Sequence, residues 1–345
     1  MRFYHIISPY FSKILTLYAS TNRYFLVIIR KTALKKNKKQ AQPFSSTTLI
    51  SPHRRFEKQL RNLIFALLFN DKKYDMQQGP IGIFDSGYGG LTIFSEIKKA
   101  LPEYDYIYLG DNARVPYGSR SFQTVYQYTK ECVFKLFDLG CNLIILACNT
   151  ASAKALRTIQ QNDLPPGKKV LGVIRPTTES INYYTKSGEI GILATLGTVR
   201  SDSYKIEINK FHPHIKVYQH ACPLWVPLVE NNEINTPPAE YLVAKDIKEI
   251  LSKSPKIDTL VLACTHYPLL LPVIERHVPS HVRILAQGPL IARSLINYLH
   301  RHSDVELSCS KKSMMTFFTT DNRQDFQEKA TLYFGEEIEA SYIKV

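Results

Sequence analysis

Two short segments of the chain repeat each other and share an unusual ending. Residues 143–150 read LIILACNT and residues 259–266 read TLVLACTH, so each apolar run stops at a cysteine followed by small polar residues. Such a run predicts a buried parallel strand that delivers a thiol at its carboxyl end, the edge where open α/β sheets bind their ligands. The repeat therefore predicts an α/β fold in which Cys148 and Cys264 form a matched acid and base on opposite sides of one substrate atom.

A second repeat supports an internal duplication. Residues 190–198 mirror residues 81–89 at an offset of 109, and the two cysteines are 116 residues apart. Two pairs of matched motifs at nearly equal offsets indicate two pseudo-equivalent halves. We expect these halves to face each other, each offering one thiol.

Apolar strands alternate with amphipathic helices from residue 79 onward, as in doubly wound α/β proteins. We predict two such lobes with the active site between them: residues 79–173 plus 287–345, and residues 174–286. The return of residues 287–345 to the first lobe rests mostly on the family resemblance described below. The expected elements of the first lobe are strands at 80–84, 106–110 and 143–147, a glycine-rich turn at 85–90, a loop at 111–120, and helices at 91–100, 122–139 and 150–161.

The positive charge of the chain is concentrated in its first 75 residues. The formal charge is +14, and residues 1–75 carry 15 Lys and Arg against 3 Asp and Glu. The apolar patches of this leader are much shorter than the ~20 residues that span a bilayer, and it lacks a clear secretory signal. We expect a disordered basic tail. The alternatives are an arm that binds nucleic acid or an anionic membrane, and a natural start at Met76, which we favour.

The six cysteines have neither C-x-x-C pairs nor zinc-finger spacing, and most of them lie in apolar runs. This pattern is typical of free thiols in a reducing compartment. We therefore expect neither disulfides nor structural zinc.

The turn at residues 85–90 has glycines spaced G-x-G-G, which differs from the G-x-G-x-x-G of dinucleotide-binding sites. Glycines let backbone N–H groups approach an anion at a helix N-terminus, and Asp85 would project a carboxylate into the same crevice. The structural alternative is a tight turn that Asp85 merely caps.

Cys148 and Cys264 each precede polar residues that would cap a helix. Since a helix N-terminus lowers the pKa of a thiol, each cysteine could act as thiolate or as acid. His266 lies on the same turn as Cys264 and is a candidate proton partner. The alternatives are buried structural cysteines and a papain-like nucleophile, although a covalent hydrolase needs only one thiol.

Five motifs, in order, resemble those of bacterial glutamate racemases, in the aspartate/glutamate racemase superfamily. The resemblance covers residues 80 to about 334 and is carried by DSGYGGL at 85–91, PYG at 116–118, ACNTA at 147–151, ACP…VE at 221–230 and ACTHYP at 263–268. In that family the aspartate of the first motif typically falls near residue ten, and Asp85 is tenth counting from Met76.

The resemblance implies racemisation of L- and D-glutamate by two cysteines, without pyridoxal phosphate, metal or other cofactor. Cys264 would remove the α-proton of L-glutamate and Cys148 would reprotonate the opposite face, assisted by His266 and Asp85 respectively. Glu230 would be a further acidic member of the site. The expected substrate-binding residues are Asp85, Ser86, Pro116, Tyr117, Gly118, Asn149, Thr150, Thr195, Thr198, Thr265 and His266.

The resemblance also implies a cytoplasmic enzyme, expected as a homodimer, that supplies D-glutamate for peptidoglycan. Its catalytic core is expected to need no nucleic acid or membrane. Within the superfamily the alternative is an aspartate racemase or a related two-thiol isomerase, because substrates that differ by one methylene are separated by only a few kcal/mol. The alternative from another class is a protein that binds nucleic acid or a membrane through the basic leader.

Overall fold

The computed structural model of the protein describes residues 77–345, to which every statement below refers. The hypotheses about the basic leader and the start at Met76 lie outside these residues. Among the described residues, no helix is long and apolar enough to cross a membrane.

The first of two parallel sheets has six strands in the order β10-β9-β2-β1-β3-β4. Its strands come from the beginning and the end of the described chain, which places the C-terminal segment beside β2. The strands are β1 (Ile81–Asp85), β2 (Tyr106–Gly110), β3 (Leu143–Leu146), β4 (Lys169–Gly172), β9 (Met315–Thr319) and β10 (Ala340–Tyr342).

The second sheet repeats the topology of the first with four parallel strands in the order β6-β5-β7-β8. The order β2-β1-β3-β4 in the first sheet is the same arrangement, with the first strand of each set between the second and the third. This agreement supports the duplication that the sequence motifs indicated. The strands are β5 (Glu189–Ala194), β6 (Lys216–Ala221), β7 (Thr259–Ala263) and β8 (Arg283–Leu285).

Helices cover both faces of the six-stranded sheet. Successive strand residues point to opposite sides of the sheet, so each face presents apolar side chains to its own layer of helices. Ile81 and Ile83 pack in one cluster with α4 (Gly90–Ala100), α14 (Gly288–Arg301) and α16 (Arg323–Phe334). Phe84 and Ile144 pack in another cluster with α5 (Phe122–Asp138) and α7 (Leu156–Asn162). The predicted class, α/β with doubly wound parallel sheets, is confirmed.

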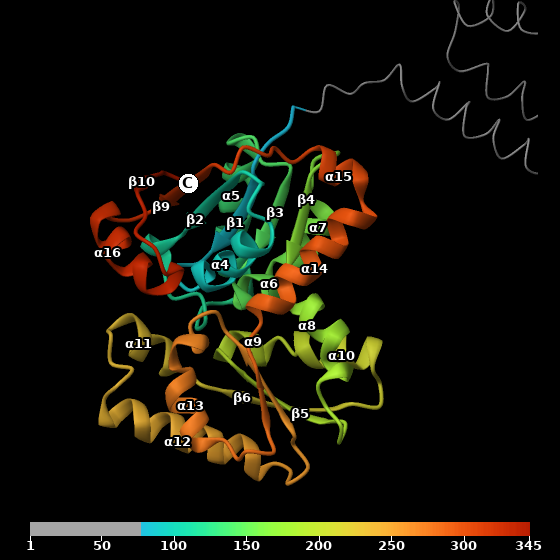
Figure 1. Ribbon diagram of the computed structural model, residues 1–345, viewed down its shortest axis with the longest axis vertical. Helices are drawn as coiled ribbons and strands as arrows, with labels where there is room; N and C mark the ends of the chain where they lie inside the picture. Colours follow the sequence, from blue (N-terminus) through green and yellow to red (C-terminus); the bar gives the residue numbers. More distant parts are fainter. Residues whose placement is uncertain (1–76) are drawn as a thin grey trace, which may run out of the picture. The chain divides into compact units, whose positions relative to one another are not determined.

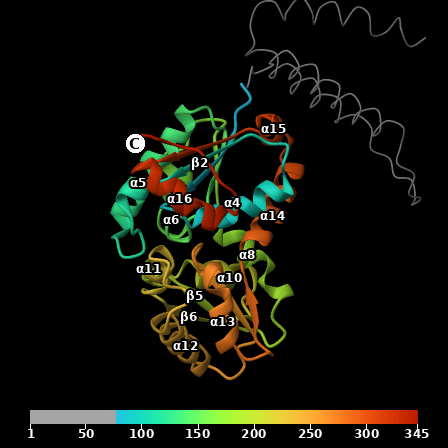
Figure 2. The same cartoon turned by 60° about the vertical axis from the view of Figure 1, so that its left-hand side comes forward.

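Figure 1 shows the six-stranded sheet with α4, α5, α14 and α16 above, and β5 and β6 with two further helices, α12 and α13, below. The same separation persists in the turned view of Figure 2. The remaining elements are η1 (Asn112–Arg114), α6 (Asn149–Lys154), α8 (Ile174–Ser180), η2 (Ile181–Tyr183), α9 (Leu196–Arg200), α10 (Ser203–Phe211), α11 (Trp225–Glu230), α12 (Pro237–Ser252), η3 (Tyr267–Leu270), α13 (Leu271–His277) and α15 (Ser303–Leu307).

Two details of the first lobe differ from the sequence prediction. The single helix expected at 150–161 is divided into α6 and α7 at Ala155, whose φ of −116° departs from helical values. The loop expected at 111–120 contains the short 3₁₀ turn η1. Neither change moves Cys148 away from the carboxyl end of β3.

An aromatic cluster joins the C-terminal segment to the first sheet. Phe94 on α4 is fully buried, and its ring centroid lies 5.1 Å from Tyr106, 5.8 Å from Phe317 and 5.1 Å from Phe334. Aromatic rings bury large apolar areas and gain further from tilted contacts of this kind. The cluster thereby fixes β9 and α16 against β2.

We predict that Phe94→Ala lowers the free energy of unfolding by ~3–5 kcal/mol, because truncation leaves a cavity among these rings. Urea denaturation followed by circular dichroism measures this change. Phe122→Ala is the matched control, since Phe122 is 52% exposed, and should change stability by less than about 0.5 kcal/mol. Equal losses in the two variants would contradict this role of Phe94.

Candidate active site

The carboxyl ends of β1, β3, β5 and β7 carry the predicted site residues. Asp85 ends β1 and Cys148 follows β3, whereas Thr195 and Cys264 directly follow β5 and β7. Both thiols are 6% exposed, and they are close enough for charge on Cys264 to raise the pKa of Cys148. The structure therefore brings together the two cysteines that the repeat predicted.

Cys148 caps helix α6. Its Sγ accepts a hydrogen bond from the backbone N–H of Ala151 at 3.4 Å, and lies 3.5 Å from Oγ of Ser86. These two contacts hold the thiol at the first helical turn and connect it to the glycine-rich turn after β1. Both contacts favour a thiolate on Cys148, but each is a single long hydrogen bond and therefore stabilises the charge only weakly.

The expectation that the helix terminus lowers the pKa of Cys148 is wrong for this structure. Burial, followed by the nearby Asp85, raises the pKa of Cys148 to about 12, and the contacts from Ser86 and Ala151 only partly oppose this. Desolvation disfavours the charged form of a thiol and here exceeds the effect of a six-residue helix. Cys148 is consequently a protonated acid at neutral pH.

Asp85 is fully buried at the start of the glycine-rich turn. Its Oδ2 accepts the backbone N–H of Gly87 at 2.9 Å, so it does cap the turn, but its Oδ1 has no hydrogen-bond partner among the described residues. Burial raises the pKa of Asp85, against the opposing effects of His266 and the N–H groups of Gly87 and Gly90. An unpartnered oxygen on a buried carboxyl group leaves one position available to a ligand or a proton.

Cys264 and Cys148 differ in the structure of the chain immediately after them. Beyond Cys264 the chain forms the 3₁₀ turn η3, which continues directly into α13, so a helical segment does begin here. His266 lies at its N-cap position, but the side-chain cap that we expected is absent. His266 turns back instead, with Nδ1 3.9 Å from Sγ of Cys264. The partner of this thiol is therefore an imidazole rather than a helix terminus.

Glu230 at the end of α11 completes this side of the site. Its Oε1 lies 3.0 Å from Nε2 of His266, which is 5% exposed. Burial opposes a charge on the imidazole, but the hydrogen bonds to Cys264 and Glu230 outweigh it and raise the pKa of His266 to about 10. His266 is thus an imidazolium at neutral pH, placed to stabilise a thiolate on Cys264.

The glycine-rich turn after β1 lies directly against the 264–266 turn after β7. A Cβ at Gly89 would stand 2.2 Å from Oγ1 of Thr265 and 2.5 Å from Nδ1 of His266. Thr92 Oγ1 also donates to the backbone carbonyl of Thr265 at 2.9 Å. Gly89 is therefore required for close approach, and it brings the turn after β1 to His266.

Three predicted threonines, which follow β3 and β5 in the chain, lie together. Oγ1 of Thr150 lies 2.9 Å from Oγ1 of Thr195, which in turn lies 3.1 Å from that of Thr198. The carbonyl of Gly118 accepts the N–H of Gly197 at 2.8 Å beside this group. These hydroxyls form a compact donor set suited to a carboxylate.

Two other predicted residues direct their side chains elsewhere. Tyr117 is buried in the first lobe, where its hydroxyl donates to Asp111, and it leaves only backbone groups beside Pro116 for a ligand. Asn149 accepts from Tyr204 at 2.6 Å and donates to Gln287 at 2.7 Å. These side chains support the site from behind rather than facing it.

Sequence reasoning missed Tyr333, which reaches the site from the C-terminal helix α16. Its ring lies edge-on to the imidazole of His266 at 5.5 Å between centroids, and its buried hydroxyl has no partner within residues 77–345. No motif surrounds Tyr333, so only the packing of α16 on the first sheet could reveal it. Gln287 was detectable in principle as a polar residue just beyond β8.

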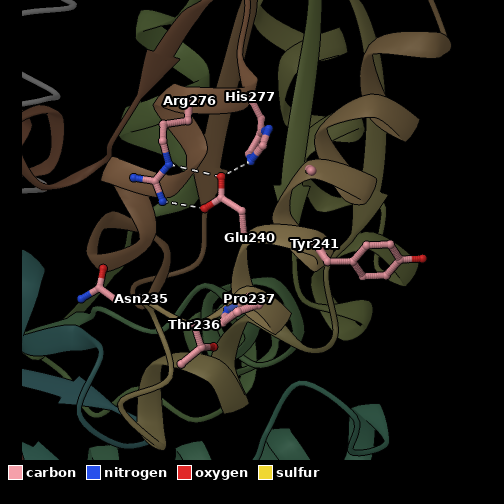
Figure 3. A pocket seen from close by; sticks show the side chains of 8 residues that line it. Asn235, Thr236, Pro237, Glu240, Tyr241, Arg276 and His277 are labelled. Carbon is pink, nitrogen blue, oxygen red and sulfur yellow. Dashed lines mark hydrogen bonds and ion pairs between the residues drawn. The ribbon is translucent and has the colours of Figure 1, made fainter.

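A surface hollow of about 570 Å³ contains none of these site residues. It is formed between the start of α12 and the end of α13, where Glu240 pairs with Arg276 and His277 (Figure 3). Glu240 thereby occupies the polar groups of both Arg276 and His277. The buried strand ends, not this hollow, concentrate the reactive groups.

Comparison with known proteins identifies the family. The family model described as Asp/Glu/Hydantoin racemase matches residues 88–295. The chain belongs to this racemase family. A glutamate racemase of Persephonella marina is 41% identical over 75% of this chain and 94% of its own. A glutamate racemase of Streptococcus agalactiae is 36% identical over 78% and 99%.

Solved structures of the racemase family have the same fold. A glutamate racemase isoform of Bacillus anthracis superposes with a TM-score of 0.72 at 34% identity, covering 78% of this chain and 98% of that one. A glutamate racemase of Francisella tularensis, solved with D-glutamate, gives a TM-score of 0.68 at 30% identity, covering 77% and 98%. The prediction of an isomerase of the amino-acid racemase class is confirmed.

The raised pKa of His266 predicts a pH-dependent stability for this racemase. Because the folded pKa of about 10 lies above the ordinary value of 6.5, the His266–Glu230 pair stabilises the fold fully below pH 6.5 and progressively less up to pH 10. We expect Glu230→Gln to lower the free energy of unfolding by about 1–3 kcal/mol at pH 6.5, and by less at pH 10. Urea denaturation at both pH values measures this difference.

The matched control is Glu233→Gln, an exposed glutamate just beyond α11. It should leave stability unchanged at both pH values. A constant loss across pH in Glu230→Gln would show that His266 does not carry the charge assigned to it.

Proposed function

We propose that the protein interconverts L- and D-glutamate by a two-base mechanism in which Cys264 and Cys148 act on opposite faces of the α-carbon. The observation that carries this proposal is the unequal surroundings of the two thiols. Cys264 lies 3.9 Å from an imidazolium, whereas Cys148 is buried beside a carboxyl group. The names of the relatives, glutamate racemases at 41% and 36% identity, support glutamate as the substrate.

For L-glutamate, Cys264 acts as the base: as a thiolate paired with the imidazolium of His266, it removes the α-proton. The Cys148 thiol, whose pKa burial raises to about 12, then donates its proton to the opposite face. Each thiol transfers one proton, so turnover leaves Cys264 as a thiol and Cys148 as a thiolate.

For D-glutamate the roles reverse, and Asp85 assists Cys148. The pKa of Asp85 is raised by burial, and its Oδ1 has no partner among the described residues, so this carboxyl group can hold a proton near Cys148. Beside Cys264, Glu230 fixes the orientation of His266, the proton partner of that thiol. The two thiols thus have different proton partners for the same chemistry.

The α-proton of an amino acid is very weakly acidic, so the site must stabilise the developing carbanion. Donors aimed at the α-carboxylate do this best where water is excluded. The hydroxyls of Thr150, Thr195 and Thr198, with backbone groups of Ser86, Gly118 and Asn149, would hold the carboxylates, and Thr265 would complete this set. Neither pyridoxal phosphate nor a metal has a part in these steps.

The burial of the site requires movement for substrate to enter. Cys148, Cys264 and Thr198 are each less than a tenth exposed. We propose that residues 79–173 plus 287–345 and residues 174–286 are two lobes that separate to admit glutamate and close around it. The hydroxyl contact between Thr150 and Thr195 would break and reform in each cycle.

We further propose a cytoplasmic homodimer whose product supplies peptidoglycan synthesis. The cytoplasmic location, the homodimer and the role in peptidoglycan synthesis rest on the family resemblance. The chemistry proposed for the site does not depend on them.

The two-base proposal predicts that Cys148→Ser and Cys264→Ser each reduce racemisation of L-glutamate by at least ~10²-fold, the usual contribution of a positioned acid or base. Circular dichroism of purified protein, without added pyridoxal phosphate, follows the loss of optical activity. Cys309→Ser is the matched control, because Cys309 is a buried thiol outside the site, and should retain the wild-type rate. Unchanged racemisation in either site variant would overturn the assignment.

Glutamate specificity is tested with the same assay. We expect kcat/KM for L-aspartate to be about 10–200-fold lower than for L-glutamate, the range that one methylene provides. Equal or faster turnover of L-aspartate would replace glutamate with aspartate as the substrate. The two-thiol mechanism would stand in either case.

A further inference from the structure

A second group of reactive side chains lies beside the four-stranded sheet, outside the site described above. It comprises His220 at the end of β6, Cys222 just beyond it, and Asp246 on α12. One ligand atom from each residue lies within 4.8 Å of the others. None of these residues has a part in the proposed proton transfers.

The fold brings these residues together in a simple way. His220 and Cys222 are two positions apart, so an extended chain directs both side chains to the same face. Helix α12 packs on β6 and presents Asp246 to that face. Cys222 is fully buried and His220 is 9% exposed, so the cluster is built into the lobe rather than lying on its surface.

The chemistry of the donors is that of a zinc site. Thiolate, imidazole and carboxylate are the three ligand types that zinc uses, whereas magnesium and calcium prefer oxygen alone. Nε2 of His220 lies 3.0 Å from Oδ1 of Asp246, a spacing that one tetrahedral ion can bridge after small side-chain rotations. We propose that His220, Cys222 and Asp246 bind one Zn²⁺, with water as the fourth ligand.

Glu249 supplies a further feature expected of such a site. It follows Asp246 by one helical turn, and its Oε1 lies 3.7 Å from Nδ1 of His220, the ring nitrogen that faces away from Asp246. Histidine ligands of metals commonly donate their second N–H to a carboxylate, which fixes the tautomer and the ring orientation. The side chain of Glu249 is 53% exposed, which marks the solvent side from which the ion enters.

The zinc site is connected to the catalytic groups through one short helix. The carbonyl of Cys222 accepts the N–H of Trp225 at 3.4 Å and the hydroxyl of Tyr267 at 3.1 Å. Trp225 begins α11, which ends at Glu230, the partner of His266. Bound zinc would therefore stabilise the segment that positions Glu230, without entering the reaction.

Cobalt binding tests the site directly, because Co²⁺ replaces Zn²⁺ and absorbs light according to its ligands. The full chain carrying Cys148→Ser and Cys264→Ser removes the competing thiols. We expect it to bind one equivalent of Co²⁺ with tetrahedral d–d bands and a thiolate charge-transfer band, both abolished by added Zn²⁺. Absence of these bands, or bands of octahedral cobalt alone, would overturn the proposal.

Variants in this background assign the ligands. Cys222→Ala should abolish the charge-transfer band, whereas the matched control Cys309→Ala should retain it, because Cys309 is a buried thiol elsewhere. Glu249→Gln keeps the fold through its exposed position and should weaken binding by ~10–100-fold. Persistence of the band in Cys222→Ala would overturn the site. If Cys222→Ala fails to fold, unchanged affinity in Glu249→Gln overturns it instead.

Discussion

The contact of His266 with Glu230 and Cys264 is the interaction on which the proposed chemistry of this protein depends. The buried imidazole is held between a carboxylate at 3.0 Å and a thiol at 3.9 Å, and its raised pKa makes it a cation at neutral pH. A buried cation of this kind stabilises negative charge on its neighbour. In the proposed mechanism it would therefore determine which of two otherwise similar thiols acts as the base toward L-glutamate.

The fold is nearly symmetric, but the surroundings of the thiols are not. Two sheets of matching strand order each deliver one cysteine, yet Cys148 caps a helix beside Asp85, whereas Cys264 precedes a 3₁₀ turn beside His266. Enantiomers have equal free energies in water, so kcat/KM must be the same in both directions. Unequal surroundings of the two thiols are still allowed, because kcat and KM can differ together between the two directions.

Much of the fold and the site could be predicted from the sequence, because buried parallel strands appear in it as continuous apolar runs and the site lies where those runs end. The pKa of Cys148 could not be predicted, since the desolvation of this thiol depends on how completely the rest of the folded chain covers it. Tyr333 could not be predicted, because helix packing over a long sequence distance brings it to His266. The cluster of His220, Cys222 and Asp246 could not be predicted either, because it combines two residues at the end of one strand with a distant residue on a helix.

The exchange of the α-hydrogen with solvent tests the two-base account most directly. L-Glutamate is incubated with the enzyme in D₂O, and at low conversion the deuterium at the α-carbon is measured by mass spectrometry in each separated enantiomer. Because the acid is a different thiol from the base, the D-glutamate formed should carry deuterium while the remaining L-glutamate stays protiated. Protium retained in the product, or equal deuterium in both enantiomers, would contradict two opposed thiols.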